Sequence, residues 1–228
     1  MSGSGAPVLG IDTSTSEAGL ALVENGRDLD GIAWDADRSQ SIELPPRLDQ
    51  MLRHHGLSPS DLKGVAVGLG PGAFTSLRVG LSLAKGMSLG ASLPLVGVPT
   101  LEALAASYAA EETPVWALLS AGRGRFSAAR YKFESGTAQR DGGYQLGTVD
   151  ELAALMEPGA VIVGDLKTEA RERVGRRLGA GARIVPADGL SPRASWVARV
   201  GAERLSRGQQ DDPRSLEPIY LPSPSQGS

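Results

Sequence analysis

The sequence contains no cysteine and only two histidines, which are adjacent at His54 and His55. The lack of cysteine excludes disulfides, thiolate zinc sites, iron–sulfur clusters and thiol nucleophiles. Two neighbouring histidines on a helix point about 100° apart, so they cannot bind one metal ion together. Since neither histidine lies near a candidate nucleophile, the chain also has no base for a Ser/His/Asp triad.

A long hydrophobic run and a targeting segment are also missing. No stretch reaches the roughly 18 apolar residues that a membrane span requires, and residues 1–6 have neither the basic nor the apolar part of a secretory signal. We therefore expect a cytoplasmic protein that does not enter a membrane. The 23 basic and 26 acidic side chains nearly balance, which argues against a general affinity for polyanions but leaves room for a local basic patch.

The pattern of apolar residues along the 228-residue chain predicts an α/β protein. Strands are expected at Val8–Asp12, Ala18–Glu24, Asp30–Trp34, Val65–Gly68, Leu95–Val98, Val115–Ser120, Arg125–Phe133 and Val161–Gly164. Helices are expected at Ser39–His55, Thr75–Leu89, Pro99–Ala110, Val149–Met156, Lys167–Leu178 and Pro192–Arg207. The first three strands should form an antiparallel meander, and Pro45 and Pro46 indicate that the first helix begins or bends there.

A change in composition after residue 110 divides the chain. We place an N-terminal unit at residues 1–110, a smaller unit at 111–208 and an irregular tail at 209–228. Pro, Ser, Gln and Asp dominate this tail, which is typical of segments without regular structure.

Two turns in the N-terminal unit have residues that could hold a phosphate. The first follows a strand and reads Asp-Thr-Ser-Thr, so its carboxylate could bind Mg²⁺ while its hydroxyl and N–H groups bind the anion. The second is rich in glycine and precedes a helix, where the backbone can approach an anion closely. The candidate phosphate residues are Asp12, Thr13, Ser14, Gly70, Gly72 and Thr75. Both turns are equally well explained by side chains and glycines that satisfy a turn backbone.

The helix expected at Thr75–Leu89 is almost uncharged, with Arg78 and Lys85 as the only charged residues between positions 64 and 101. Small residues recur at every fourth position along it, at Ser76, Gly80, Ala84 and Ser88. Such a stripe lets another helix or strand come close. The helix is therefore either buried inside its own domain, which is the default interpretation, or covered by a partner protein.

A basic cluster lies in the expected hairpin of the second unit. Arg123, Arg125, Arg130 and Lys132 have Glu134 as the only nearby acid. On alternating strands Arg123 and Arg125 share a face and could follow a nucleic-acid backbone. The commoner explanation is a solvated hairpin whose edge is protected by charge.

Four segments of this sequence, taken in order and spacing, resemble one protein family. They are residues 9–15 (LGIDTST), 68–75 (GLGPGAFT) with Arg78-Val79-Gly80, 98–101 (VPTL) and 218–221 (PIYL). The chain is similar in these segments to the TsaB (YeaZ) family, the bacterial partner of the transferase TsaD in the synthesis of threonylcarbamoyladenosine on tRNA. Ser76, Ser120 and Pro222 depart from the usual family pattern.

The resemblance implies an actin-like ATPase (ASKHA) fold with two RNase H-like lobes, in which helices flank mixed sheets. It implies a non-catalytic subunit that pairs with TsaD and the ATPase TsaE for threonylcarbamoylation of the adenosine next to the anticodon. It further implies a homodimer when TsaD is absent, tRNA contact only through the complex, no cofactor or metal of its own, and a phosphate site that is only vestigial.

The same resemblance places the partner interface on the helices expected at Ser39–His55 and Thr75–Leu89, and packs the tail near residues 217–221. The interface residues implied are Leu48, Met51, Leu52, Ser76, Leu77, Gly80, Leu81, Ala84, Met87 and Ser88.

A second function from another class stays open at this point. A small ATP- and Mg²⁺-dependent kinase or ATPase of the same fold would use Asp12 and the glycine-rich turn on its nucleotide. The lack of a plausible ligand set argues strongly against a third function, a metallopeptidase.

Overall fold

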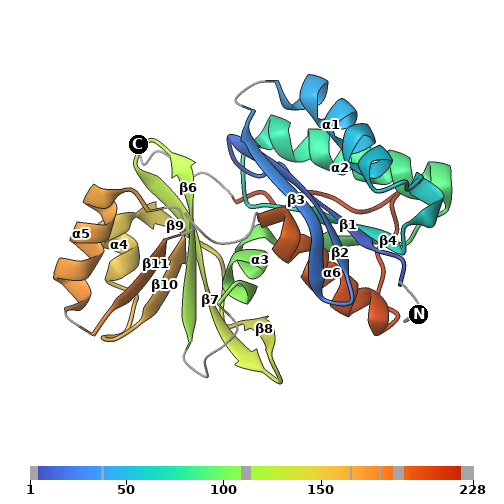
Figure 1. Cartoon of the computed structure of the whole chain (residues 1–228). Coiled ribbons are helices and arrows are strands. Elements are labelled where there is room, and N and C mark those ends of the chain that lie inside the picture. The colour runs from blue at the N-terminus through green and yellow to red at the C-terminus, as the bar shows by residue number, and fades with distance from the viewer. Residues whose placement is uncertain are drawn as a thin grey trace. The chain divides into compact units, whose positions relative to one another are not determined.

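The computed structural model describes residues 5–36, 39–108, 114–164, 166–179, 181–186 and 193–221 (Figure 1). The chain forms two compact units. The first unit combines residues 1–103 with 191–219, and the second combines residues 104–190 with 220–228. None of the described helices is both long enough and apolar enough to span a membrane.

A five-stranded sheet with the order β3-β2-β1-β4-β5 forms the centre of the first unit. Its strands are β1 (Val8–Asp12), β2 (Glu17–Glu24), β3 (Arg27–Asp35), β4 (Gly64–Gly68) and β5 (Leu95–Val98). The first three strands pair antiparallel, as the meander prediction requires, whereas β1, β4 and β5 run parallel. The carboxyl end of β1, where Asp12 lies, therefore sits beside the end of β4 in the middle of the sheet.

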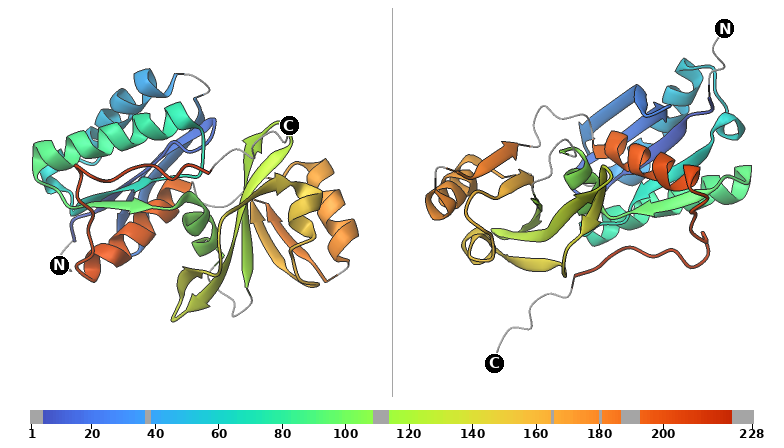
Figure 2. Two further views of the ribbon diagram at one scale, coloured as in Figure 1. Left: turned by 180° about the vertical axis from the view of Figure 1, so that it is seen from behind. Right: turned by 90° about the horizontal axis from the view of Figure 1, so that it is seen from below.

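Helices cover both faces of this sheet. They are α1 (Gln40–His54), α2 (Phe74–Ala91) and α6 (Arg193–Ser206), with the short η1 (Pro59–Asp61) after α1 and α3 (Thr100–Ala106) after β5. Both α1 and α2 lie on one face, and α6 lies on the opposite face (Figures 1 and 2). The apolar side chains of α1, α2 and the sheet form one continuous core.

The position of α6 corrects the expected division of the chain, which assigned residues 111–208 to the second unit. Residues 193–206 instead pack on the first sheet, and glycines make this close contact possible. A Cβ at Gly10 would lie 2.1 Å from the carbonyl oxygen of Ala194, and one at Gly201 would lie 2.3 Å from the Cβ of Ala66. At these distances only glycine lets the helix lie flat on the strands.

The prolines in α1 do not mark its start. The helix begins at Gln40, and Pro45 and Pro46 lie inside it. Each proline removes one backbone hydrogen bond, yet the helix continues because Leu44, Leu48 and other apolar side chains of the same face are buried in the core.

The second unit contains a sheet with the order β11-β10-β6-β7-β8, and β9 also pairs with β7. Its strands are β6 (Val115–Gly122), β7 (Arg125–Glu134), β8 (Thr137–Arg140), β9 (Gln145–Thr148), β10 (Val161–Gly164) and β11 (Arg183–Pro186). Helices α4 (Val149–Ala153) and α5 (Thr168–Leu178) pack against the core of this unit. The strands β8, β9 and β11 were not predicted from the sequence, because each has only four residues and only one residue in each of β8 and β9 is buried.

After α6 the chain runs along the first unit without regular structure up to Ile219. The N–H of Asp211 donates to the carbonyl of Leu95, and its carboxylate accepts from the N–H of Gly97 at 2.8 Å. Further on, the N–H of Ile219 donates to the carbonyl of Leu69. The tail thereby satisfies backbone groups on the open edge of β5 and in the loop after β4.

Candidate functional site

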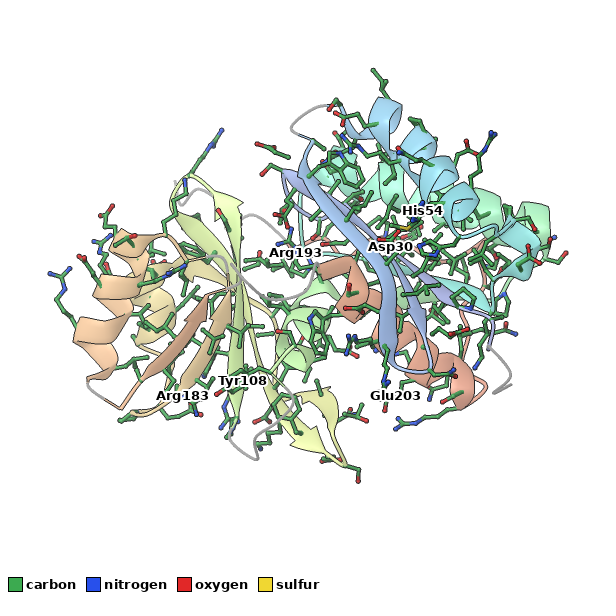
Figure 3. All side chains as sticks on the ribbon, in the orientation of Figure 1. Asp30, His54, Tyr108, Arg183, Arg193 and Glu203 are labelled. Carbon is green, nitrogen blue, oxygen red and sulfur yellow. The ribbon has the colours of Figure 1, made fainter. Side chains whose placement is uncertain are left out.

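The Asp12 turn is closed by side chains of its own unit. Asp12 is 1% exposed, and its Oδ1 accepts a hydrogen bond from the N–H of Ser14 at 3.2 Å. The Oδ2 atom lies 2.9 Å from Nε of Arg193, the first residue of α6. Thr13 is fully buried, and its hydroxyl donates to the carbonyl of Ser76 in α2 at 2.7 Å. Arg193 projects from the end of α6 toward this turn (Figure 3).

The glycine-rich turn packs directly on the Asp12 turn. A Cβ at Gly72 would lie 2.2 Å from the carbonyl oxygen of Ser14, which also accepts a hydrogen bond from the N–H of Ala73. Gly70 has a φ of +92°, and its N–H donates to the hydroxyl of Thr100 at 3.0 Å. These glycines are therefore required for the turn conformation and for close packing.

The six residues predicted to hold a phosphate are thus not arranged around an open site. The structure brings five of them, Asp12, Thr13, Ser14, Gly70 and Gly72, into two turns that pack on each other. In these turns the N–H groups of Ser14 and Gly70 and the carboxylate of Asp12 bond to protein atoms. Thr75 is exposed and lies apart from them, beside α1. Within the described residues, no group of three or more His, Cys, Asp or Glu side chains could hold a metal ion.

The stripe of small residues on α2 faces inward. Ser76, Gly80, Ala84 and Ser88 are all buried, and a Cβ at Gly80 would lie 2.4 Å from the hydroxyl oxygen of Thr13. Among the other predicted interface residues, Met87 is half-buried against the core. The remaining ones are fully inside the core: Leu48, Met51, Leu52, Leu77 and Leu81. The structure therefore corrects the prediction that these side chains contact a partner, because they form the core of the first unit.

The outer face of the same two helices forms a groove. Its volume is about 620 Å³, and most of its lining surface is apolar. Phe74 is 53% exposed at its edge, and the guanidinium of Arg78 stacks on the Phe74 ring at 3.9 Å. The groove is lined by Ser41, Leu44, Pro45, Phe74, Thr75, Arg78, Val79, Ser82 and Leu83.

More apolar surface and a second set of small residues extend this outer face. Ile42 is 76% exposed and Leu89 is 59% exposed. Ser82, Gly86 and Gly90 recur at every fourth position and are exposed, and no described atom lies within 4 Å of a Cβ built at either glycine. Glycine in a helix interior costs about 1 kcal/mol relative to alanine, and nothing in the described structure requires it here.

This outer face was not predicted from the sequence. A signal for it was present, because the spacing of Ser82, Gly86 and Gly90 equals that of the inner stripe. A helix with small residues on two opposite faces does not indicate by itself which face meets the core. We call the groove, Ile42, Leu89 and these three residues the outer α1–α2 face.

The basic cluster of the second unit is largely neutralised. Arg130 pairs with Asp141 and, at 2.9 Å, with Glu157, while Lys132 pairs with Asp141 at 2.9 Å. Arg125 donates to the carbonyl of Leu146 at 2.9 Å. Most of these cations are therefore used to join strands of the second unit.

The carboxylates of this cluster have lowered pKa values. The hydrogen bond from Lys132 is the main reason that the pKa of Asp141 falls below its ordinary value. Burial alone would raise the pKa of Glu157, but hydrogen bonds from its own backbone, Trp116 and Arg130 together lower it. A carboxylate whose pKa is lowered by folding stabilises the protein above its unfolded pKa, and this stabilisation is lost as the pH falls through the folded value.

We therefore expect Glu157→Gln to destabilise the protein at neutral pH by about 1 kcal/mol or less, since the Glu157 side chain is 39% exposed. Below pH 4.5, the reference pKa of glutamate, the wild type loses this contribution and the difference between the two proteins should shrink. Urea unfolding at neutral pH and at about pH 3 measures this change. An equal difference at both pH values would contradict the assigned role of the carboxylate.

The two histidines hold no metal site. The Nε2 atom of His55 lies 3.0 Å from Oδ2 of Asp30, and the His54 ring packs edge-on against the His55 ring. Figure 3 labels His54, the last residue of α1, and Asp30, which lies on β3. These contacts fasten the end of α1 to β3.

Comparison with known proteins points to one family. A family model described as TsaD, tRNA N6-adenosine threonylcarbamoyltransferase, matches residues 34–179. The tRNA threonylcarbamoyladenosine biosynthesis protein TsaB of Escherichia coli is 29% identical over 230 residues, which cover 94% of each chain.

Solved structures agree on the fold. YeaZ from Pseudomonas aeruginosa superposes with a TM-score of 0.77 at 23% identity, covering 95% of this chain and 100% of that one. The activator of the 2-hydroxyisocaproyl-CoA dehydratase from Clostridium difficile, solved with bound ADPNP, has a TM-score of 0.53 at 10% identity, covering 90% and 99%. Mixed sheets flanked by helices in both units confirm the expected actin-like fold. The chain is similar to TsaB along almost its whole length. The family model matches more than half of the chain, which leads to one conclusion: the chain belongs to the TsaD family.

Proposed function

We propose that this chain is the non-catalytic subunit of a bacterial complex that makes threonylcarbamoyladenosine on tRNA, and that it binds and activates a TsaD-type transferase. The observation that carries the proposal is the outer α1–α2 face, which combines an apolar groove with exposed Ile42, Phe74 and Leu89. The similarity to TsaB along 94% of the chain supports the identity of the partner.

The composition of the outer α1–α2 face favours a protein partner. Contiguous apolar surface on a soluble protein typically marks an interaction site. Exposed Ser82, Gly86 and Gly90 let a second helix come close to the backbone of α2. The outer face is therefore suited to pack against helices of another protein, and a second copy of this chain could use it when the transferase is absent.

The kinase or ATPase alternative is not favoured. Such an enzyme needs a carboxylate that can reach a hydrated Mg²⁺ ion, whereas Asp12 is buried and paired with Arg193. The Clostridium difficile activator, solved with ADPNP, shares only 10% identity with this chain. We propose accordingly that the chain has no cofactor of its own and that any nucleotide and metal belong to the transferase.

The remaining partners follow from the same proposal. We propose that a TsaE-type ATPase joins the pair in the cytoplasm and that tRNA reaches this chain only through the assembled complex. The pairing of Arg130 and Lys132 with acids supports the indirect contact with tRNA, since paired cations are less available to phosphates.

The first experiment is co-purification of this chain with the TsaD homologue of its own genome, followed by size-exclusion chromatography with light scattering. We expect a stable heteromer. In a tRNA-modification assay we expect neither protein alone to be active. Failure to associate, with or without nucleotide and the TsaE homologue, would reject the proposal and make an ATPase assay of this chain the next step.

A further inference from the structure

The guanidinium of Arg193 lies against the one buried carboxylate of the Asp12 turn. Its Nε is 2.9 Å from Asp12 Oδ2, and its Nη2 donates to the hydroxyl of Thr15 at 2.6 Å. The same nitrogen lies 3.3 Å from a carboxylate oxygen of Glu17. The Arg193 side chain is 11% exposed and that of Asp12 is 1% exposed, so the contact between these two is shielded from water.

The oxygen atoms of this turn are of the kind that bind divalent cations. A carboxylate and hydroxyls gather at the end of β1, and the Ser14 hydroxyl is buried without a hydrogen-bond partner among the described residues. A Mg²⁺ ion, however, needs about six oxygen ligands at roughly 2.1 Å and usually keeps several of its waters. Asp12 is 1% exposed and both its oxygens accept hydrogen bonds from protein groups. The turn as it stands does not fit a hydrated cation.

We propose that Arg193 replaces a divalent cation at Asp12 and thereby closes this turn to metal ions and to metal-bound phosphates. The guanidinium supplies the positive charge that the buried carboxylate requires. Arginine cannot release its proton at physiological pH, so the replacement is permanent. Arg193 lies on α6 and follows Asp12 by 181 positions in the chain. The closure therefore depends on the packing of α6 on the first sheet.

The proposal is tested with Mn²⁺ as the probe, measured by electron paramagnetic resonance and by thermal unfolding. The variants are Arg193→Met, which keeps the apolar length of the side chain, Arg193→Lys, which keeps a cation, and the double variant Asp12→Asn/Arg193→Met. We expect Arg193→Met to lower Tm by about 10 °C, because a buried carboxylate loses its partner. Millimolar Mn²⁺ should bind this variant and recover part of the loss.

The controls separate this site from other carboxylates. Mn²⁺ should leave the Tm of the wild type and of Arg193→Lys unchanged, and it should have no effect on the double variant. An Arg193→Met protein that ignores Mn²⁺, whether folded or not, would overturn the proposal. So would a wild type whose Mn²⁺ binding disappears in Asp12→Asn. Neither outcome depends on the partner protein, so the proposed function is tested separately.

Discussion

Gly86→Arg is expected to weaken the association with the TsaD-type partner by at least about 100-fold while the free subunit stays folded. Gly86 is exposed on α2, and a Cβ built on it meets no described atom within 4 Å. The free subunit can therefore accept an arginine there. In a packed interface the same side chain would fill the space of a neighbouring helix and bury an unpaired charge, which costs several kcal/mol.

Gly175→Arg is the matched control for this experiment. Gly175 also lies inside a helix, α5 of the second unit, and a Cβ there also meets no described atom within 4 Å. Affinity is measured by titration calorimetry, and folding by circular dichroism. Equal affinities for wild type and Gly86→Arg would show that the partner does not cover the outer α1–α2 face. A similar loss in both variants would show that the added charge acts without a specific contact.

Gly80→Leu is expected to destabilise the first unit by several kcal/mol, whereas Gly86→Ala should stabilise it by about 1 kcal/mol. The two glycines lie on opposite faces of α2. A Cβ at Gly80 would lie 2.4 Å from the hydroxyl oxygen of the fully buried Thr13, and that hydroxyl is held by the carbonyl of Ser76. Any larger side chain must displace Thr13 and, with it, the turn that follows β1.

Urea unfolding of the four proteins, wild type, Gly80→Ala, Gly80→Leu and Gly86→Ala, measures these changes. Gly80→Ala should lie between the wild type and Gly80→Leu, at a cost of about 1–3 kcal/mol. A Gly80→Ala protein as stable as the wild type would contradict the packing of α2 on the Asp12 turn. If Gly86→Ala also weakens the complex, glycine at this position favours the interface although it lowers the stability of the free subunit.

The sequence was sufficient for the elements with strong local patterns. Continuous apolar runs such as Val65–Gly68 were recognised as buried strands, and the meander of β1 to β3 followed from three runs joined by short polar turns. The motifs around Asp12 and Gly70 were sufficient to indicate the family, because each consists of residues only a few positions apart and can be recognised directly in the sequence. Short strands with exposed side chains, such as β8, carried no such pattern and were missed.

The sequence did not indicate which face of α2 is buried and which is exposed. The sequence presents small residues at Gly80 and Ala84 on one side and at Ser82 and Gly86 on the other. Only the tertiary structure decides between them, because burial depends on which face meets the sheet. The first pair packs inside the unit, and the second pair is exposed.

The sequence by itself therefore determined the fold class and the family, and it predicted a binding surface on α1 and α2. The tertiary structure decided which side of those helices is free, that α6 returns to the first sheet, and that Arg193 occupies the Asp12 turn. The physical reason is the range of the contacts. Periodicity and turn chemistry act between residues a few positions apart, whereas the ion pair of Asp12 with Arg193 joins residues 181 positions apart.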